Sequence, residues 1–506
     1  MKQFQVFNPE HDMALANGDK HFIAPKNIRE MARDLTPLLE VMQCTHPLVW
    51  GWDAVVTEQL HRQGIPIDEL PTEVALAALR THSERKMAHQ MLHTFRTDKP
   101  DGPYAGESIL VHTLEEIRSY AAQHGHIVLK DPLSSSGKGL RHVNTHQKTH
   151  PIPPCEGGGT DISEPQILPH REDLGGSIFS WANALIRRHG YITAEPYYNK
   201  VQDFAMEFYV QNGQCRFIGY SLFNTNDHGR YEESILMKDE RIEELLEQYI
   251  PCAALHEVRD WVIEHITSII PSEWNTQKFP LYFGIDMMVV KTTDNRQQTT
   301  DDGQQTRLVP VSETQVNLRF RCECSQSATT QLLTDSSQFP IFNSPFRIHP
   351  CVEINLRLNM GIIAHEVRQR ILAPQAEGTF HVQAFPTPEM LKDFHQKQLT
   401  AHPATYKEGR VAAGYHPLTP ILPDTKHHAY IIVRQLTTDN RRQTESNQAR
   451  LDCRRRGMIA SVATTEALAS SRSLACEYRR RKTLQSRING QLTKKAAYDT
   501  TFWGVP

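Results

Sequence analysis

Two apolar segments with charged residues inside them set the strongest limit on the fold of this chain. LYFGIDMMVVK, at residues 281–291, is almost continuously apolar around Asp286, and VEINLR alternates apolar residues with Glu353, Asn355 and Arg357. Side chains two positions apart in a strand share a face, so VEINLR predicts a strand with one charged face. Such charges are costly unless they are paired or metal-bound, and carboxylate and amide oxygens suit Mg²⁺. The alternative is an edge strand whose polar face lies in water.

A second pattern, IVLKDPLSSSGKGL at residues 127–140, joins an apolar strand to a loop of serine and glycine. Lys130 ends the strand, and the loop offers hydroxyl groups and unobstructed N–H groups that can wrap phosphate oxygens. The loop lacks the G-x-x-x-x-G-K-[ST] pattern of a P-loop. The segment therefore predicts either a phosphate-binding strand and loop or a surface loop with solvated lysines.

The remaining sequence predicts alternating helices and strands. We expect an α/β stretch over 1–80, two helices or one broken helix over 73–95, a helix and strands over 176–225, and helices over 239–270. Asn212-Gly213 between two alternating runs predicts a hairpin turn. A helix at 362–371 is expected to close the ordered part.

Polar stretches interrupt this pattern. Segments at about 144–175 and 292–348 are rich in proline, glycine or polar residues, and we expect both to be insertions. Residues 434–506 carry clustered arginines and few large apolar residues, which predicts a disordered basic tail. These arginines are the only hint of a nucleic-acid partner.

Composition narrows the class of protein further. The 506 residues have a net charge of −3, so no general basic excess points to nucleic acid. The nine scattered cysteines predict no disulfide framework. The N-terminus lacks the apolar core of a signal peptide, and no run of 18 apolar residues predicts a membrane span. We therefore expect a cytoplasmic protein with no membrane partner.

Four motifs, in this order, resemble those of the ATP-grasp superfamily, which includes D-alanine–D-alanine ligase, biotin carboxylase and carbamoyl-phosphate synthetase. SERKMAHQML resembles the helix start before the ATP-grasp module, and IVLKDPLSSSGKGL its strand lysine and flexible loop. YITAEPYY with DFAMEFYV resembles its hinge strand, and GIDMMVV with VEINLRLNMG its two metal strands. Together the motifs cover about residues 80–370.

The resemblance implies a fold of the α/β class with four parts. An α+β ATP-grasp module would occupy residues 81–375, preceded by a small Rossmann-like domain at 1–80. A C-terminal extension would follow at 376–433, and the disordered tail at 434–506.

The resemblance also implies which residues contact the phosphates of ATP. Lys130 would contact the α- and β-phosphates, and Arg85 or the adjacent Lys86 would take the place of the usual lysine at the helix start. The residues of the loop that would close over the β- and γ-phosphates are Ser135, Ser136, Gly137 and Lys138.

Adenosine and metal contacts follow from the other two motifs. Glu195 would open the hinge that meets adenine, and the backbone of Tyr197 would bind the base. Glu207, or less favourably Asp203, would hold the ribose hydroxyls. Asp286 and Glu353 would bind Mg²⁺ or Mn²⁺ with Asn355, and Arg357 would steady the transferred phosphoryl group or the acyl phosphate.

The activity implied is that of an ATP-dependent ligase. A substrate carboxylate would become an acyl phosphate, and an amine or thiol would displace phosphate, with ADP and phosphate released. Partners would be small-molecule or peptide carboxylates and amines, and the chain could form a homodimer. Two alternatives stay open, namely a kinase of the ATP-grasp type and a non-catalytic nucleotide-binding protein.

Two segments are candidates for recognising the substrate. One is 8–18, NPEHDMALANG, which follows the first strand where open α/β sheets place ligands. Its alternative is a helix N-terminus capped by Asn8. The other is 219–236, whose alternative is a plain loop. The polar residues that they offer are Glu10, His11, Asp12, His228, Arg230 and Tyr231.

Overall fold

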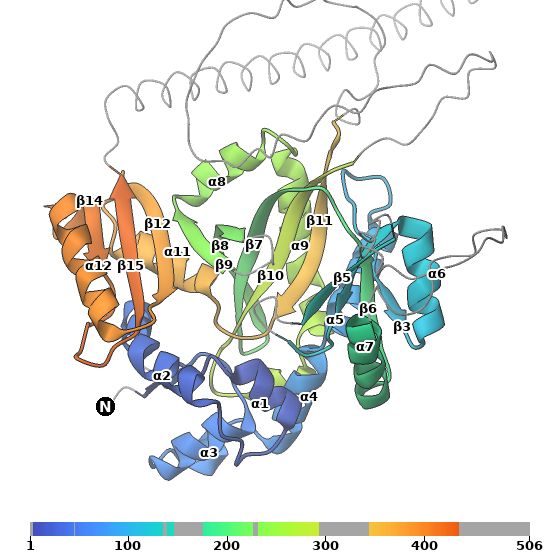
Figure 1. The fold of residues 1–506 in the computed structure, drawn as a ribbon, viewed down its shortest axis with the longest axis horizontal. Helices are drawn as coiled ribbons and strands as arrows, with labels where there is room; N and C mark the ends of the chain where they lie inside the picture. Colours follow the sequence, from blue (N-terminus) through green and yellow to red (C-terminus); the bar gives the residue numbers. More distant parts are fainter. Residues whose placement is uncertain are drawn as a thin grey trace, which may run out of the picture. The chain divides into compact units, whose positions relative to one another are not determined.

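Figure 1 shows the computed structural model, which describes residues 4–44, 46–134, 139–145, 176–225, 231–292 and 344–434. The predicted phosphate loop residues Ser135, Ser136, Gly137 and Lys138 lie outside the described residues. The same holds for His228 and Arg230, for most of both predicted insertions, and for the predicted basic tail after Arg434. The described residues fall in one unit, Met1–Gln435, and the mixed α/β class is confirmed.

The N-terminal segment is a small α/β layer. β1 (Gln5–Val6) and β2 (Leu48–Val49) pair in parallel. The α-helices of this part are α1 (His11–Asn17), α2 (Lys26–Leu35), α3 (Ala54–Arg62), α4 (Glu73–His82) and α5 (Arg85–Asp98). It also has two 3₁₀ helices, η1 (Thr36–Met42) and η2 (Ile67–Glu69). The stretch predicted over 73–95 is therefore a pair of helices. Its second member begins at the arginine of the SERK motif.

A four-stranded antiparallel sheet holds the predicted strand lysine. Its strands run in the order β3 (Ile109–Val111), β6 (Ile192–Pro196), β4 (His126–Lys130), β5 (Leu140–Asn144). Helices α6 (Leu114–His124) and α7 (Gly176–His189) pack on it around a buried core that includes Ile117, Ile127 and Ile192. Lys130 ends β4 at the edge of this core, as the sequence predicts.

The large sheet has nine strands in the order β11-β10-β7-β8-β9-β12-β15-β14-β13. Their bounds are β7 (Lys200–Gln211), β8 (Gln214–Thr225), β9 (Tyr231–Leu236), β10 (Leu281–Lys291), β11 (Phe346–Asn355), β12 (Glu377–Ala384), β13 (Thr405–Lys407), β14 (Arg410–Pro417) and β15 (His427–Arg434). The turn between β7 and β8 has φ values of 52° at Asn212 and 72° at Gly213, which confirms the predicted hairpin.

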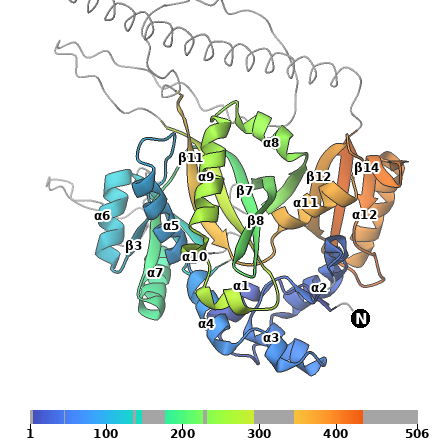
Figure 2. The ribbon, with the colours of Figure 1, turned by 180° about the vertical axis from the view of Figure 1, so that it is seen from behind.

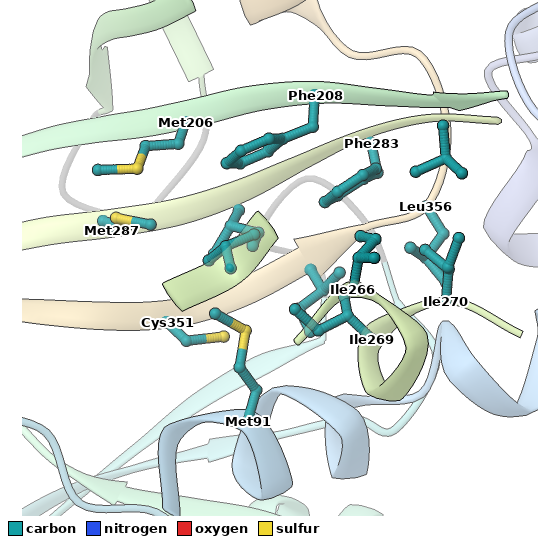
Figure 3. Close-up of a cluster of buried hydrophobic side chains, with 14 of the residues drawn as sticks. Met91, Met206, Phe208, Ile266, Ile269, Ile270, Phe283, Met287, Cys351 and Leu356 are labelled. Carbon is teal, nitrogen blue, oxygen red and sulfur yellow. The ribbon is translucent and has the colours of Figure 1, made fainter. Parts of the chain in front are cut away.

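Alternation along the strands separates an apolar face from a polar face. On β10, Phe283, Ile285 and Met287 are buried in the main core, where Phe283 stacks on Phe208 of β7 at 5.0 Å (Figure 3). Helices α5, α9 (Cys252–Glu264) and α10 (Ile266–Ile269) contribute to this core. Helix α9 can be seen in Figure 2, which shows the molecule from behind. α8 (Asp239–Leu246) and η3 (Ser272–Thr276) flank α9 and α10 in the chain. Asp286 therefore belongs to the opposite face, because the side chains alternate.

Two predictions about the end of this region are wrong. β11 stops at Asn355, so Arg357 lies beyond the strand and does not share its face with Glu353. The helix predicted at 362–371, which is α11 (Met360–Arg370), does not close the ordered part. β12, α12 (Pro388–Ala401) and β13–β15 follow it. Because β12 pairs with β9, residues 377–434 extend the large sheet.

Candidate active site

The carboxylates predicted to bind a metal lie side by side on the polar face of the large sheet. Asp286 of β10 is directly opposite Glu353 of β11, and a register shift follows between Asp286 and Met288. The Nδ2 of Asn355 donates to Oδ2 of Asp286 at 3.2 Å. The strand pairing thus brings together the three residues that the sequence singled out as metal ligands.

Electrostatics favour a cation beside this pair of carboxylates. Burial, and then the charges of Glu353 and Glu207, raise the pKa of Asp286 well above its ordinary value. Like charges on facing strands repel, and a cation between them relieves the repulsion. The side chain of Glu353 is 25% exposed, so a ligand can reach the pair.

The donor set fits Mg²⁺ only if a substrate completes it. Within the described ranges, no three His, Cys, Asp or Glu side chains gather as a metal-binding group. Asp286 and Glu353 with Oδ1 of Asn355 would supply three hard oxygens. Mg²⁺ is commonly held by one or two carboxylates together with water and substrate phosphates. The residues present therefore suit a metal that arrives with a phosphorylated substrate.

Lys130 lies where the two sheets meet. Its Nζ is 2.5 Å from Oε2 of Glu195 on β6 and donates to the carbonyl oxygen of Val352 on β11 at 3.3 Å. Lys130 and Glu195 are both buried. The lysine predicted to meet phosphate thus lies beside the strand that carries Glu353. The hinge carboxylate Glu195 serves as its counterion.

Arg85 reaches the same place from the first turn of α5. One of its terminal nitrogens lies 3.0 Å from Oε1 of Glu353, while the neighbouring Lys86 is exposed. Burial opposes the charge of Arg85, but the carboxylate of Glu353 keeps its pKa above the ordinary value. Its buried Nε has no hydrogen-bond partner within the described part of the chain. Of the two cations predicted at this helix start, Arg85 is the one at the site.

Arg357 connects the end of β11 to the N-terminal segment. One terminal nitrogen lies 3.2 Å from Oδ2 of Asp12, and Nε donates to Oδ1 of the same residue at 3.4 Å. Burial would raise the pKa of Asp12, but Arg357 and then His11 hold it well below its usual range. His11 is buried, with Nε2 3.0 Å from the carbonyl oxygen of Trp52. The candidate segment 8–18 therefore adjoins the predicted active site.

At the hinge, the backbone N–H of Tyr197 is used within the small sheet. It donates to the carbonyl oxygen of His126 at 2.9 Å, which extends the pairing of β4 with β6. The exposed ring of Tyr197 stacks on His126, with centroids 4.1 Å apart. A contact between the N–H of Tyr197 and adenine is therefore not available in this structure, and the predicted backbone contact with the base stays a prediction for the carbonyl oxygen of Tyr197.

The two predicted ribose ligands have different surroundings. Glu207 is 1% exposed and accepts hydrogen bonds from Ser221 Oγ at 2.8 Å and Asn359 Nδ2 at 2.7 Å. The side chain of Asp203 is 15% exposed and contacts Lys200 Nζ and Thr225 Oγ1. Glu207 is thus fully engaged within the protein and Asp203 is the more exposed of the two, while the ribose contact of either carboxylate stays a prediction.

Two glycines, Gly284 and Gly361, lie directly against the carboxylate of Glu207. A Cβ at Gly284 or Gly361 would lie 2.4 or 2.0 Å from its carboxylate oxygens. Asn359, which donates to Glu207, also caps α11 by accepting from the N–H of Ile362 at 3.0 Å. This carboxylate therefore joins β7 to the start of α11, on the same polar face of the large sheet as Asp286.

We expect Glu207→Gln to flatten the pH dependence of stability. Burial raises the pKa of Glu207 to about 7 from 4.5, so between these values the folded protein holds a proton that the unfolded chain has released. The free energy of unfolding should then fall as pH rises from 4.5 to 7, by on the order of 3 kcal/mol for this group. Urea unfolding of both proteins across this range, without Mg²⁺, measures the difference. Parallel pH slopes would contradict the assignment.

Two polar residues of this region were not among the predictions. Asn359 precedes a helix, and an asparagine in that position is a capping signal visible in the sequence. His349 of β11 is fully buried, packs edge-on against Tyr198 at 5.3 Å, and has its pKa lowered to about 3 by burial and the nearby Lys130. Nothing in the sequence marks His349, because its surroundings come from several segments.

In the described part of the segment 219–236, Tyr231 is engaged within the large sheet. The hydroxyl of Tyr231 lies 2.9 Å from Ser234 Oγ and donates to the carbonyl oxygen of Phe380 at 3.3 Å. Tyr231 therefore connects β9 to β12.

Among the described residues, no helix is long and apolar enough to cross a membrane.

No protein-family model and no curated protein matches the chain. Solved structures similar to it include N5-carboxyaminoimidazole synthetase from Staphylococcus aureus complexed with ADP, at 11% identity and a TM-score of 0.37, covering 88% of this chain and 97% of that one. Biotin carboxylase from Campylobacter jejuni, complexed with β-γ-ATP, has 10% identity and a TM-score of 0.38, with coverages of 79% and 74%.

A third similar structure is the biotin carboxylase domain of Hydrogenobacter thermophilus 2-oxoglutarate carboxylase, complexed with MgADP and bicarbonate. It has 9% identity and a TM-score of 0.36, with coverages of 84% of this chain and 78% of that one. Biotin carboxylase is one of the enzymes whose motifs the sequence resembles. At these TM-scores the likeness transfers neither substrate nor mechanism.

Proposed function

We propose that this chain is an ATP-dependent ligase of the ATP-grasp type. It activates a substrate carboxylate as an acyl phosphate and joins the acyl group to an amine, or to a thiol, with release of ADP and phosphate. The observation that carries the proposal is the facing pair Asp286 and Glu353 with three buried or half-buried cations around it. These cations are Lys130, Arg85 and Arg357.

This charge pattern matches the requirements of phosphoryl transfer. The reaction needs its phosphates positioned and their negative charge neutralised, with little covalent chemistry from side chains. Lys130 and Arg85 are held by carboxylates of the protein, so each is fixed before a phosphate arrives. Asp286, Glu353 and Asn355 would hold Mg²⁺, which would supply positive charge against the negative charge of the phosphates.

We assign the orientation of the acid substrate to Arg357. Its guanidinium is paired with the carboxylate of Asp12, and this fixed orientation supports the role. A planar guanidinium binds a carboxylate or an acyl phosphate through two parallel hydrogen bonds. In the proposed reaction Arg357 stabilises the acyl phosphate, and Asp12 holds the guanidinium at the correct angle.

The test is ADP formation by the purified full chain with Mg-ATP. Pools of small carboxylic acids and short peptides are supplied with and without pools of amines. ADP that appears only when an acid and an amine are both present supports the ligase. ADP formed with one substrate alone, leaving a stable phosphorylated product, identifies a kinase instead. Tight Mg-ATP binding without turnover for any pool would contradict both activities.

We expect Asp12→Asn to lower kcat by about 10-fold or more, because a misoriented reacting group is costly even when binding persists. The KM for ATP should change little, since Asp12 contacts Arg357 and not the cations Lys130 and Arg85. The matched control is Asp68→Asn, at an exposed residue, which should leave both constants unchanged. A rise in the KM for ATP with an unchanged kcat would assign Asp12 to nucleotide binding and contradict the positioning role.

A further inference from the structure

The C-terminal part of the large sheet holds a hollow that the proposed ATP site does not use. Its volume is about 420 Å³, and it lies between α12 and the connection from β14 to β15. Volumes of this size are typical of sites for small molecules. The residues that line it include Lys392, His395 and Gln396 on α12, with Pro417, Thr419 and Ile421 on the opposite wall. The three helical residues are spaced so that they share one face of α12.

A continuous row of hydrogen bonds runs from one wall of this hollow to the other through the protein interior. Nδ1 of His395 is 2.9 Å from the Tyr415 hydroxyl, which is 2.8 Å from Nε2 of His428. Nδ1 of His428 is 3.0 Å from Oγ1 of Thr419. Tyr415 and His428 are fully buried. Buried rows of this kind are conformationally rigid when every member is satisfied.

The row has a preferred direction. Oγ1 of Thr419 accepts from the N–H of Ala429 at 3.0 Å, and within the described residues Nδ1 of His428 is the acceptor within reach of its own proton. Each neutral imidazole has one donor and one acceptor nitrogen. Thr419 then donates to His428, His428 donates to Tyr415, and Tyr415 donates to Nδ1 of His395. The opposite direction would leave the hydroxyl proton of buried Thr419 without its acceptor, which is unfavourable.

This direction fixes what His395 offers to the hollow. Since Nδ1 of His395 accepts from Tyr415, its proton is on Nε2, the ring nitrogen that remains for a ligand. Burial lowers the pKa of both His395 and His428, the latter to about 4, so both rings are neutral near pH 7. The hollow therefore presents an oriented N–H donor beside the ammonium group of Lys392 and the amide of Gln396.

We propose that this hollow is a binding site for a small organic anion, with its carboxylate or phosphate group on Lys392 and Nε2–H of His395. The body of the ligand would pack on Pro417 and Ile421. Lys392 and His395 supply donors, and no carboxylate is among the lining residues, so the hollow selects an acceptor group of negative charge. The site is independent of the proposed ligase activity, because none of its residues belongs to the ATP site.

The test is a methyl NMR titration of the full chain labelled at the Ile δ1 methyl groups. The probes are benzoate, which has a carboxylate on an apolar ring, and inorganic phosphate. Ile421 reports from the hollow, and Ile431, which is fully buried in β15, serves as the internal control. A saturable shift at Ile421 alone is expected. Benzoate acting alone identifies a carboxylate, and phosphate acting alone identifies a phosphate ester. No saturable shift with either probe overturns the proposal.

Two variants separate this site from non-specific anion binding. Lys392→Ala should weaken binding about fivefold, the loss expected for one partly exposed ion pair. Lys397→Ala, on the same helix but outside the hollow, should leave binding unchanged. Tyr415→Phe should also weaken it, because the His395 proton is then no longer held on Nε2. If Tyr415→Phe does not fold, the Lys392→Ala variant, at an exposed residue, provides the test. Equal binding by the wild type and by the Lys392 variant would overturn the proposal.

Discussion

Glu353→Gln should reduce ADP formation by more than about 100-fold, since losing even an outer partner of a metal ligand commonly costs 10–100-fold. The substitution keeps the shape of the side chain and removes the charge that faces Asp286 and binds Arg85. Fewer charges then attract Mg²⁺ to the phosphates, so the activity that remains should require more Mg²⁺. The measurement is ADP release as a function of Mg²⁺ concentration.

The control for this variant is Glu115→Gln, at a side chain of α6 that is 84% exposed. It should leave activity unchanged, because exposed pairs contribute little. Glu353→Gln should remain folded, since water reaches Glu353 and Asp286 still lies near Arg85. Wild-type turnover by a folded Glu353→Gln protein would remove this carboxylate from the mechanism and the ligase proposal with it.

Lys130→Met should lower the free energy of unfolding by about 3–5 kcal/mol, the cost typical of removing one partner of a buried ion pair. Glu195 would then be left as a buried carboxylate without its counterion. The double variant Lys130→Met with Glu195→Met should recover most of this loss. A well-packed apolar pair often replaces a buried ion pair at no cost. Urea unfolding of the single and double variants measures both effects.

The chain offers a matched control for this comparison. Lys200 and Asp203 have the same separation of 2.5 Å, but their side chains are 40% and 15% exposed. Lys200→Met should therefore cost less than about 1 kcal/mol. The stable double variant should still bind Mg-ATP weakly, because the cation at the junction of the sheets is gone. Recovery of ATP affinity together with stability would show that Lys130 serves only the fold.

Local patterns were enough to predict most elements up to about residue 370 and the polar face that carries the candidate metal ligands. Asp286, Glu353 and Asn355 could be identified because the period of a strand is two, so each charged residue stands out against buried neighbours. Lys130 could be placed at the end of a strand for the same reason. The Asn212-Gly213 hairpin followed from turn chemistry, since both residues tolerate positive φ. Such features depend only on residues close together in the chain.

The tertiary structure decided which charges are partners. Arg357 and Asp12 are 345 positions apart, and Lys130 meets Glu195 only because β4 and β6 are neighbours in the small sheet. The strand that was predicted to include Arg357 ends two residues earlier, and the turn that follows directs its side chain to the N-terminal segment. Pairings of this kind depend on how sheets and loops pack against one another. Local periodicity in the sequence does not predict that packing.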